Sequence, residues 1–285
     1  MQVITLLFMA NGVMNADLDL VEYFAGQMAV TRCWSRCGFR ACPFEINLCE
    51  NEMMDILSPV GFCVAMVMAL RCRPNGFAMI ATVCSSWVFL SRSKTQRSFW
   101  NPLGNREVKS VEDANVMVSR MTLILFILQC KNVFYLYEQP GSSLLWYHPR
   151  MDKFISTINA FRAWTWMGAF GAESPKGTTL WSSRPAVQKL CRVLPQKNWS
   201  QVEMTKKKIL ENGKCSVSGG KDLKKSQAYT DEFGFSTLSV WLGEDEVPLP
   251  DVGNIVIPNL WEPITKQNRW EDARLTEVMQ YLALN

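Results

Sequence analysis

Four short apolar runs in the first half of the chain each end in, or run into, a glycine, an acidic residue or a cysteine. These runs cover residues 18–26, 40–46, 77–83 and 132–140, and segments with helical spacing lie between them. Short apolar runs that alternate with helices are typical of a parallel sheet with helices on both faces. The pattern predicts an α/β fold with a doubly wound, mostly parallel sheet over residues 15–185.

The segments between and after these runs predict the rest of the fold. A turn is expected at 74–76, where the sequence reads PNG. Residues 186–285 lose the strand–helix alternation, so we expect a small, lysine-rich and helical C-terminal extension that packs on the main domain. The expected helices span 27–39, 61–72, 114–130, 154–164, 231–242 and 268–284.

The composition excludes several classes of protein. With 285 residues, of which 48% are hydrophobic and 20% charged, the chain is globular and long enough to bury a large core. No stretch reaches the roughly 18–20 consecutive apolar residues of a membrane-spanning helix. The formal net charge of +4 is compatible with a polyanionic partner and does not require one.

The ten cysteines are scattered through the chain without the spacing of a disulfide framework. A zinc site would have to use Cys33, Cys37, Cys42 and Cys49, but these lack the paired short spacings of structural zinc sites, and the chain has a single histidine. We therefore expect no metal. The N-terminal apolar run lacks the basic residues of a secretory signal, so we expect reduced thiols and an intracellular protein, in the nucleus or the cytoplasm.

Gly26 and Glu45 stand near the ends of the first two runs. In open α/β sheets, ligands bind at the carboxyl ends of the strands, where a glycine lets a ligand approach the backbone closely. A carboxylate about 20 residues beyond such a glycine can accept hydrogen bonds from both hydroxyls of a ribose. The turn reads GQMAV and has a single glycine, which fits an adenosyl ligand without phosphates better than a dinucleotide.

Taken in order, these motifs resemble those of the DNA cytosine carbon-5 methyltransferases, a branch of the class I S-adenosylmethionine-dependent enzymes. EYFAGQMAVT is similar to their cofactor turn, and FEI to the acidic end of their second strand. ATVCSSWVFLSR lies in the place of their nucleophile loop and YEQP in the place of their Glu-Asn-Val motif. FGAESPKGTTLW resembles their segment Y-G-x-x-x-x-K-R-x-x-x-W. The resemblance covers residues 18–183, with a fainter echo at 226–234.

The resemblance implies a Rossmann-like class I methyltransferase fold and methyl transfer from S-adenosylmethionine to a nucleobase, cytosine carbon 5 in DNA above all. Cys84 would be the thiolate that adds to carbon 6 of the base, which makes carbon 5 able to attack a methyl group. Glu138 would hold the base and supply a proton, once the base has been flipped out of the helix. Phe24 and Gly26 would line the cofactor site, and Glu45 would bind the ribose hydroxyls.

The chain departs from the family pattern at several places. Val83 precedes the cysteine where the family has a proline, so the loop is less rigid. Gln139 and Pro140 follow Glu138 in place of Asn and Val, and Gly177 stands where an arginine is usual. About forty residues separate the last of these motifs from the echo, which leaves little chain for a region that reads the sequence of duplex DNA.

Lysines are concentrated in residues 204–226. A lysine-rich face is usually a solvated surface, but it can also contact the phosphates of a nucleic acid, either DNA or RNA. Trp199 and Tyr229 lie near the ends of this segment and could stack on bases. The candidate nucleic-acid contacts are Lys176, Lys206, Lys207 and Lys208.

Three functions stay open at this point. The first is methyl transfer to a nucleobase with Cys84 as the nucleophile. The second is a catalytically inactive binding or scaffold module that keeps the fold, with or without the cofactor pocket, because the nucleophile loop and the arginine have changed. The third is an adenosyl-dependent enzyme that acts on RNA or on a small molecule, for which Cys84 would be dispensable.

Overall fold

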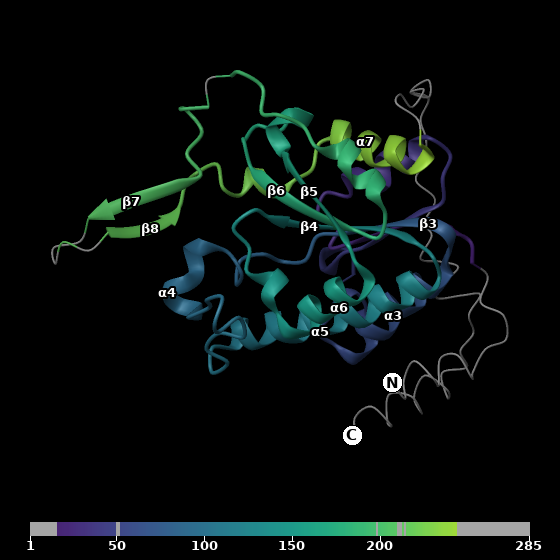
Figure 1. Ribbon diagram of the computed structural model, residues 1–285, viewed down its shortest axis with the longest axis horizontal. Coiled ribbons are helices and arrows are strands. Elements are labelled where there is room, and N and C mark those ends of the chain that lie inside the picture. Colours follow the sequence, from purple (N-terminus) through teal and green to yellow (C-terminus); the bar gives the residue numbers. More distant parts are fainter. Residues whose placement is uncertain (1–15, 50–51, 198, 210–212, 214, 244–285) are drawn as a thin grey trace.

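The computed structural model describes residues 16–49, 52–197, 199–209, 213 and 215–243 (Figure 1). Its centre is a six-stranded sheet in the order β2-β1-β3-β4-β6-β5, and a separate two-stranded sheet projects from it. The strands of the central sheet are β1 (Leu18–Tyr23), β2 (Ala41–Phe44), β3 (Cys72–Ile80), β4 (Phe134–Pro140), β5 (Phe161–Trp166) and β6 (Gly177–Ser182).

The strand directions decide which chain segments meet at the edge of the sheet. Strands β1 to β4 run parallel, whereas β6 runs antiparallel to both β4 and β5. The carboxyl ends of β1 to β4 and the start of β6 therefore lie along one edge, where Pro140 pairs with Thr178. The predicted α/β fold with a mostly parallel sheet is confirmed at this level.

Helices cover both faces of the sheet (Figure 1). One face carries α3 (Pro59–Arg71), α5 (Lys109–Cys130) and α6 (Pro149–Ile158). The other carries α2 (Ala29–Arg36) and α7 (Asp231–Leu242), which pack against each other. Helix α7 belongs to the segment predicted as a C-terminal extension, and it supplies part of the core on its face of the sheet.

Side chains alternate between the two faces along each strand, as strand geometry requires. On β4, Tyr135 and Tyr137 enter the core beneath α3 and α5, and Phe134 and Leu136 enter the core beneath α2 and α7. The second core is tied across the chain by Trp34, whose Nε1 donates to the Thr237 hydroxyl at 3.1 Å. The short apolar runs therefore read as fully buried strands because both of their faces are covered.

Two predictions of local structure are wrong. The helix expected over 154–164 ends at Ile158, because Asn159 adopts a left-handed conformation (φ 51°) and the chain then enters β5. The turn expected at 74–76 lies inside β3, where the pairing with β1 is irregular. The lysine-rich segment, for which the sequence predicts no regular element, forms β7 (Thr205–Ile209) and β8 (Cys215–Gly219).

Some predictions concern residues that the structure does not describe. These are the N-terminal apolar run within residues 1–15 and the closing helix at 268–284. Within the described residues, no helix has both the length and the apolar character needed to span a membrane. The nine described cysteines with assigned side chains are free thiols: Cys33, Cys37, Cys42, Cys49, Cys63, Cys72, Cys84, Cys130 and Cys191.

Two glycines let an indole ring cover the join between β4 and β6. The Gly141 N–H donates to the Gly177 carbonyl at 2.9 Å, and the ring of Trp164 lies over both residues. A Cβ on Gly141 would stand 2.0 Å from Trp164 Cη2, and one on Gly177 would stand 2.8 Å from Cζ2. The tryptophan thus occupies the space beside Gly177, which explains why no larger residue stands there.

We expect Gly141→Ala to destabilise the protein by about 1–3 kcal/mol, because the added methyl group overlaps the Trp164 ring, which would have to shift. In a Trp164→Ala background the same substitution should cost much less, since the ring is gone. Urea unfolding of the four proteins measures this difference. An equal loss of stability in both backgrounds would show that the indole is not what excludes a side chain at this position.

Candidate functional site

The turn after β1 and the end of β2 are joined by a hydrogen bond. The Gly26 N–H donates to Glu45 Oε2 at 2.9 Å. The other carboxylate oxygen, Oε1, accepts from the Asn47 side-chain amide at 2.8 Å and from its backbone N–H at 3.3 Å. Because β1 and β2 are parallel neighbours, their ends bring these two predicted cofactor residues into direct contact. The carboxylate is half-buried and faces the turn.

The turn itself has an unusual backbone. Phe24, Gly26 and Met28 have φ angles of 59°, 51° and 56°, all in the left-handed region. For Phe24 and Met28 this conformation is strained, by about 1–3 kcal/mol for each residue. Phe24 packs its ring against the core, while a Cβ on Gly26 would meet nothing within 4 Å. The backbone at Gly26 is therefore open to a ligand.

The start of the loop that carries Cys84 is held by side chains of β4 on the face of the sheet that α3 and α5 cover. Gln139 is fully buried, and its Nε2 donates to the Thr82 carbonyl at 2.7 Å and to the Thr82 hydroxyl at 3.1 Å. The same hydroxyl lies 2.8 Å from the Tyr137 hydroxyl. Gln139 thus anchors the start of the loop that carries Cys84, two residues before the thiol.

A buried arginine supports the other end of this loop. The guanidinium of Arg97 lies 3.5 Å from the centre of the Trp87 ring and donates to the Ser86 carbonyl and hydroxyl at 3.0–3.1 Å. Its remaining donors reach α5 through the Val111 carbonyl and the Asn115 side chain. Burial of this charge lowers the pKa of Arg97 to about 10. The sequence placed Arg97 in a polar segment and gave no sign of its burial.

Glu138 is the acidic centre of the site. Its side chain is buried, with the residue 4% exposed, and it extends from β4 toward the face covered by α7. Lys176 Nζ lies 3.1 Å from Oε1, and the Tyr229 hydroxyl donates to Oε2 at 2.8 Å. The contact with Lys176 is an ion pair without hydrogen-bond geometry, so Oε1 keeps its acceptor capacity.

Lys176 and Tyr229 reach Glu138 for topological reasons. Lys176 stands just before β6, which starts at the sheet edge where β4 ends. Tyr229 stands just before α7, and the Thr230 hydroxyl donates to the Phe170 carbonyl at 2.5 Å, which ties this segment to the loop before β6. Tyr229, predicted as a residue that could stack on bases, instead holds the carboxylate. Lys176, predicted as a nucleic-acid contact, lies in the same cluster.

Cys84 belongs electrostatically to this cluster. Burial raises the pKa of the Cys84 thiol, Lys176 acts to lower it and Glu138 acts to raise it. The same thiol contributes to a raised pKa of Tyr229. Cys84 therefore lies within electrostatic range of Glu138 and Lys176, with the thiol mainly protonated at neutral pH and the lysine charge favouring the thiolate.

A second buried carboxylate, Glu22, lies on the same face of the sheet. It is 1% exposed, and its Oε2 accepts from the backbone N–H of Thr31 at 2.7 Å and from the Thr31 hydroxyl. Its Oε1 has no hydrogen-bond partner among the described residues. Burial raises the pKa of Glu22 to about 7. A lone acidic residue inside an apolar run, as in LVEYF, was a signal that could have identified it.

The three remaining candidate lysines lie on the β7–β8 arm, which projects from the body of the protein (Figure 1). All five residues of β7 are exposed, and the lysines pair across the ribbon with Ser218, Val217 and Ser216 in turn. Because neighbouring strand residues point to opposite faces, both faces of the arm carry positive charge. These lysines are Lys206, Lys207 and Lys208.

Exposed aromatic residues gather beside the base of this arm. Strand β8 lies against the short helix η3 (Phe89–Ser91), which continues the Cys84 loop. The side chain of Arg92 lies over the rings of Phe89 and Phe99, and Trp100 is 97% exposed. Exposed aromatic rings in contact with an arginine are typical of surfaces that stack nucleobases and contact phosphates.

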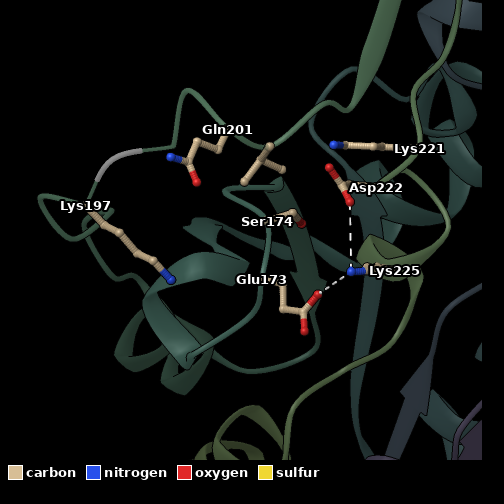
Figure 2. A pocket seen from close by; sticks show the side chains of 8 residues that line it. Glu173, Ser174, Lys197, Gln201, Lys221, Asp222 and Lys225 are labelled. Atoms are coloured by element: carbon tan, nitrogen blue, oxygen red, sulfur yellow. Dashed lines mark ion pairs between the residues drawn. The ribbon is translucent and has the colours of Figure 1, made fainter.

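Two open pockets lie near these elements. One, of about 260 Å³, lies at the base of the arm, and its lining includes three lysines and two acidic residues (Figure 2). The other, of about 430 Å³, includes His148 and Arg120 on the α5–α6 side. His148 is buried, and burial lowers its pKa to about 4. Within the described residues, no group of three or more His, Cys, Asp or Glu side chains could hold a metal ion.

Comparison with known proteins adds no assignment. No protein-family model matches the chain, and no curated protein matches it at a significant level. The family resemblance therefore rests on the order of the motifs at the strand ends. The chemistry of the site therefore follows from its own residues alone.

Glu22 predicts a measurable pH dependence of stability. Its folded-state pKa of about 7 lies above the ordinary value of 4.5, so between these values the folded protein holds a proton that the unfolded chain has released. This contribution to stability is present below pH 4.5 and is lost as the pH rises through 7, by about 3 kcal/mol. We expect Glu22→Gln to remove this loss.

Urea unfolding of wild type and Glu22→Gln at pH 5 and pH 8 tests this expectation. Other titrating groups, such as His148, contribute equally to both proteins, so the difference between them isolates Glu22. The stability of the variant relative to wild type should rise between pH 5 and pH 8. An unchanged difference would mean that the carboxylate is ionised in the folded protein at both pH values.

Proposed function

We propose that the protein transfers a methyl group from S-adenosylmethionine to a nucleobase, with cytosine carbon 5 in DNA as the first candidate. One observation carries the proposal: a buried carboxylate paired with a lysine lies at the sheet edge where the neighbouring strand β3 leads into the loop with the thiol, within electrostatic range of both charges. These residues are Cys84, Glu138 and Lys176. The resemblance to the cytosine carbon-5 methyltransferases assigns the first two as nucleophile and acid.

The residues at the ends of β1 and β2 fit an adenosyl cofactor. The backbone at Gly26 has no neighbour within 4 Å of the position where a Cβ would stand, which leaves a place for the ligand. The Glu45 carboxylate faces this place and could exchange its bond with the Gly26 N–H for ribose hydroxyls. S-adenosylmethionine, when bound, supplies an electrophilic methyl group on a sulfonium. Phe24 would line its site from the strand side.

In the proposed reaction, the Cys84 thiol first passes its proton to solvent water, and the resulting thiolate adds to carbon 6 of the base. Burial opposes ionisation, and the Lys176 ammonium favours it. The carbon–sulfur bond that forms makes carbon 5 nucleophilic. Carbon 5 would then take the methyl group, with the demethylated thioether of the cofactor as the leaving group. Transfer of the carbon-5 proton to solvent water and loss of Cys84 from carbon 6 as a thiolate would restore the double bond. The Thr82, Gln139 and Arg97 contacts keep the loop in place through these steps.

Glu138 holds the base and stabilises the charge that builds on the ring. Its Oε1 retains acceptor capacity that the exocyclic amino group of cytosine could use. When protonated, the carboxyl group could donate to the ring nitrogen at position 3. Tyr229 fixes Oε2, so the carboxylate is positioned before the base arrives. Lys176 offsets its negative charge when no base is bound.

The proposed partner is a nucleic acid, DNA or RNA, in an intracellular compartment. The exposed lysines of β7 and the aromatic and arginine side chains beside η3 lie on the side of the molecule that carries the Cys84 loop. Phosphate contacts from lysines give affinity without sequence preference, and aromatic stacking holds unpaired bases. The free thiols of the described cysteines suit a reducing compartment.

The alternative is an inactive binding module with the same fold. One observation favours it: the pKa of the Cys84 thiol is raised, and Glu138 already has two partners. Such a module could keep the cofactor pocket, because the Gly26 and Glu45 arrangement does not depend on Cys84. Calorimetry with S-adenosylmethionine tests the pocket directly, and Glu45→Ala should abolish the binding heat if the ribose is held there.

Covalent trapping on DNA that contains 5-fluorocytosine tests the proposed reaction. With S-adenosylmethionine present, methylation leaves carbon 5 with fluorine in place of the proton. Fluorine cannot leave as a proton does, so the carbon–sulfur bond should persist and link protein to DNA. We expect a covalent adduct for wild type and none for Cys84→Ser. Cys63→Ser is a matched control, because it removes a half-buried thiol from α3 and should leave trapping unchanged.

The outcomes separate the three functions. An adduct that depends on Cys84 supports the thiolate mechanism. Methyl transfer to RNA or a small molecule that persists in Cys84→Ser would instead support an enzyme that does not use this thiol. Cofactor binding without an adduct on single-stranded or duplex DNA, and without methyl transfer, would contradict the proposal in favour of a binding module.

A further inference from the structure

A pocket at the base of the arm is formed by three segments of the chain (Figure 2). One segment lies between the short helix η5 (Met167–Phe170) and β6, the second precedes β7, and the third follows β8. The pocket has a volume of about 260 Å³. Its lining residues are Glu173, Ser174, Lys197, Gln201, Val202, Lys221, Asp222 and Lys225.

Backbone contacts hold these segments in a fixed arrangement. The Glu203 N–H donates to Asp222 Oδ2 at 2.9 Å, and the Asp222 N–H donates to the Glu203 carbonyl at 3.2 Å. On the other wall, the Trp199 ring packs on Gly168, where a Cβ would stand 2.7 Å from the ring. The pocket is therefore part of the packed structure and not a gap between loose loops.

The charges that line the pocket leave two lysines uncompensated. Lys225 lies 3.2 Å from Glu173 and 3.9 Å from Asp222, so it pairs with both carboxylates of the lining. Lys197 and Lys221 form no ion pair with any acidic side chain in the described part of the chain. Figure 2 shows their ammonium groups on opposite sides of the cavity, with Ser174 between them. The pocket thus favours an anion.

Ser174 provides a second, independent sign of a ligand. It is 2% exposed and lines the cavity, yet its hydroxyl has no hydrogen-bond partner among the described residues. A buried hydroxyl without a partner is unfavourable, so such groups usually have a bound partner. A hydroxyl donor, an amide at Gln201 and two ammonium groups together suit a ligand with several anionic oxygens.

We propose that this pocket binds a phosphate group. It lies next to the candidate site along both walls: Ser174 is two residues before Lys176, and Lys225 is four residues before Tyr229. Lys176 and Tyr229 both contact Glu138. On the proposed function, this group is a backbone phosphate of the nucleic acid, close to the base that enters the site.

Calorimetric titration of the full chain with inorganic phosphate tests the pocket itself. We expect Lys221→Gln and Ser174→Ala each to weaken phosphate affinity by about tenfold, because each removes a donor to a charged group. Lys153→Gln removes an exposed lysine from α6 and should leave the affinity unchanged. Ser174→Ala should unfold at the same urea concentration as wild type or a higher one, since its hydroxyl has no partner to lose.

The affinity for a fluorescent single-stranded oligonucleotide, measured by anisotropy at several salt concentrations, tests the source of the phosphate. If a backbone phosphate occupies the pocket, Lys221→Gln should reduce the slope of log K against log salt by about 0.7. An unchanged slope with lost phosphate binding would support the pocket and assign it to a small phosphate compound. Equal phosphate affinity in all four proteins would overturn the inference.

Neither readout requires methyl transfer. A failed trapping experiment with phosphate binding intact would contradict the proposed function and leave the phosphate pocket standing. Trapping that succeeds while phosphate binding is the same in every variant would contradict the pocket alone.

Discussion

The ion pair between Glu138 and Lys176 joins the two parts of the sheet that run in different directions. Glu138 lies at the end of parallel strand β4, and Lys176 lies before antiparallel strand β6, with Nζ and Oε1 3.1 Å apart. A buried carboxylate without its partner would cost about 3–5 kcal/mol, so each residue requires the other. Tyr229 adds a third segment to the pair and thereby connects α7 to the sheet edge.

The parallel order of β1 to β4 explains why the remaining groups gather at this edge. Every parallel strand delivers its carboxyl end to the same side, so the Gly26 turn, Glu45, Cys84 and Glu138 follow from one topological rule. The chemistry available at this edge then depends on which side chains follow each strand. Gly26 and Glu45 are joined by a hydrogen bond from backbone to carboxylate, and Glu138 and Lys176 by an ion pair. The Cys84 thiol is linked to that pair through electrostatic influence.

The strands that carry these groups could be predicted because both of their faces are buried, which makes them continuous apolar runs with polar ends. The edge strand β5 could not, since Arg162 and Trp164 are exposed and the segment follows a helix without a glycine or proline break. Asn159 was the available stop signal. The β7 strand was hidden for a related reason, because it has no buried face to produce an apolar pattern.

Within the site, sequence alone pointed to groups at strand ends and missed those that reach the site from the far part of the chain. Tyr229 and Arg97 act through tertiary contacts that no local pattern encodes. Glu22 was visible as a carboxylate in an apolar run, but only the contact with Thr31 places it beneath α2. The role of Gln139 also follows from a distant contact, the one with Thr82.

The pH dependence of Cys84 alkylation, followed by mass spectrometry of the peptide that contains it, tests the cluster most directly. The account predicts opposite changes in two variants. Lys176→Gln should move the apparent pKa of the thiol upward, because a stabilising positive charge is lost, and Glu138→Gln should move it downward, because a repelling negative charge is lost. An apparent pKa that neither substitution changes would mean that the thiol is not part of this cluster.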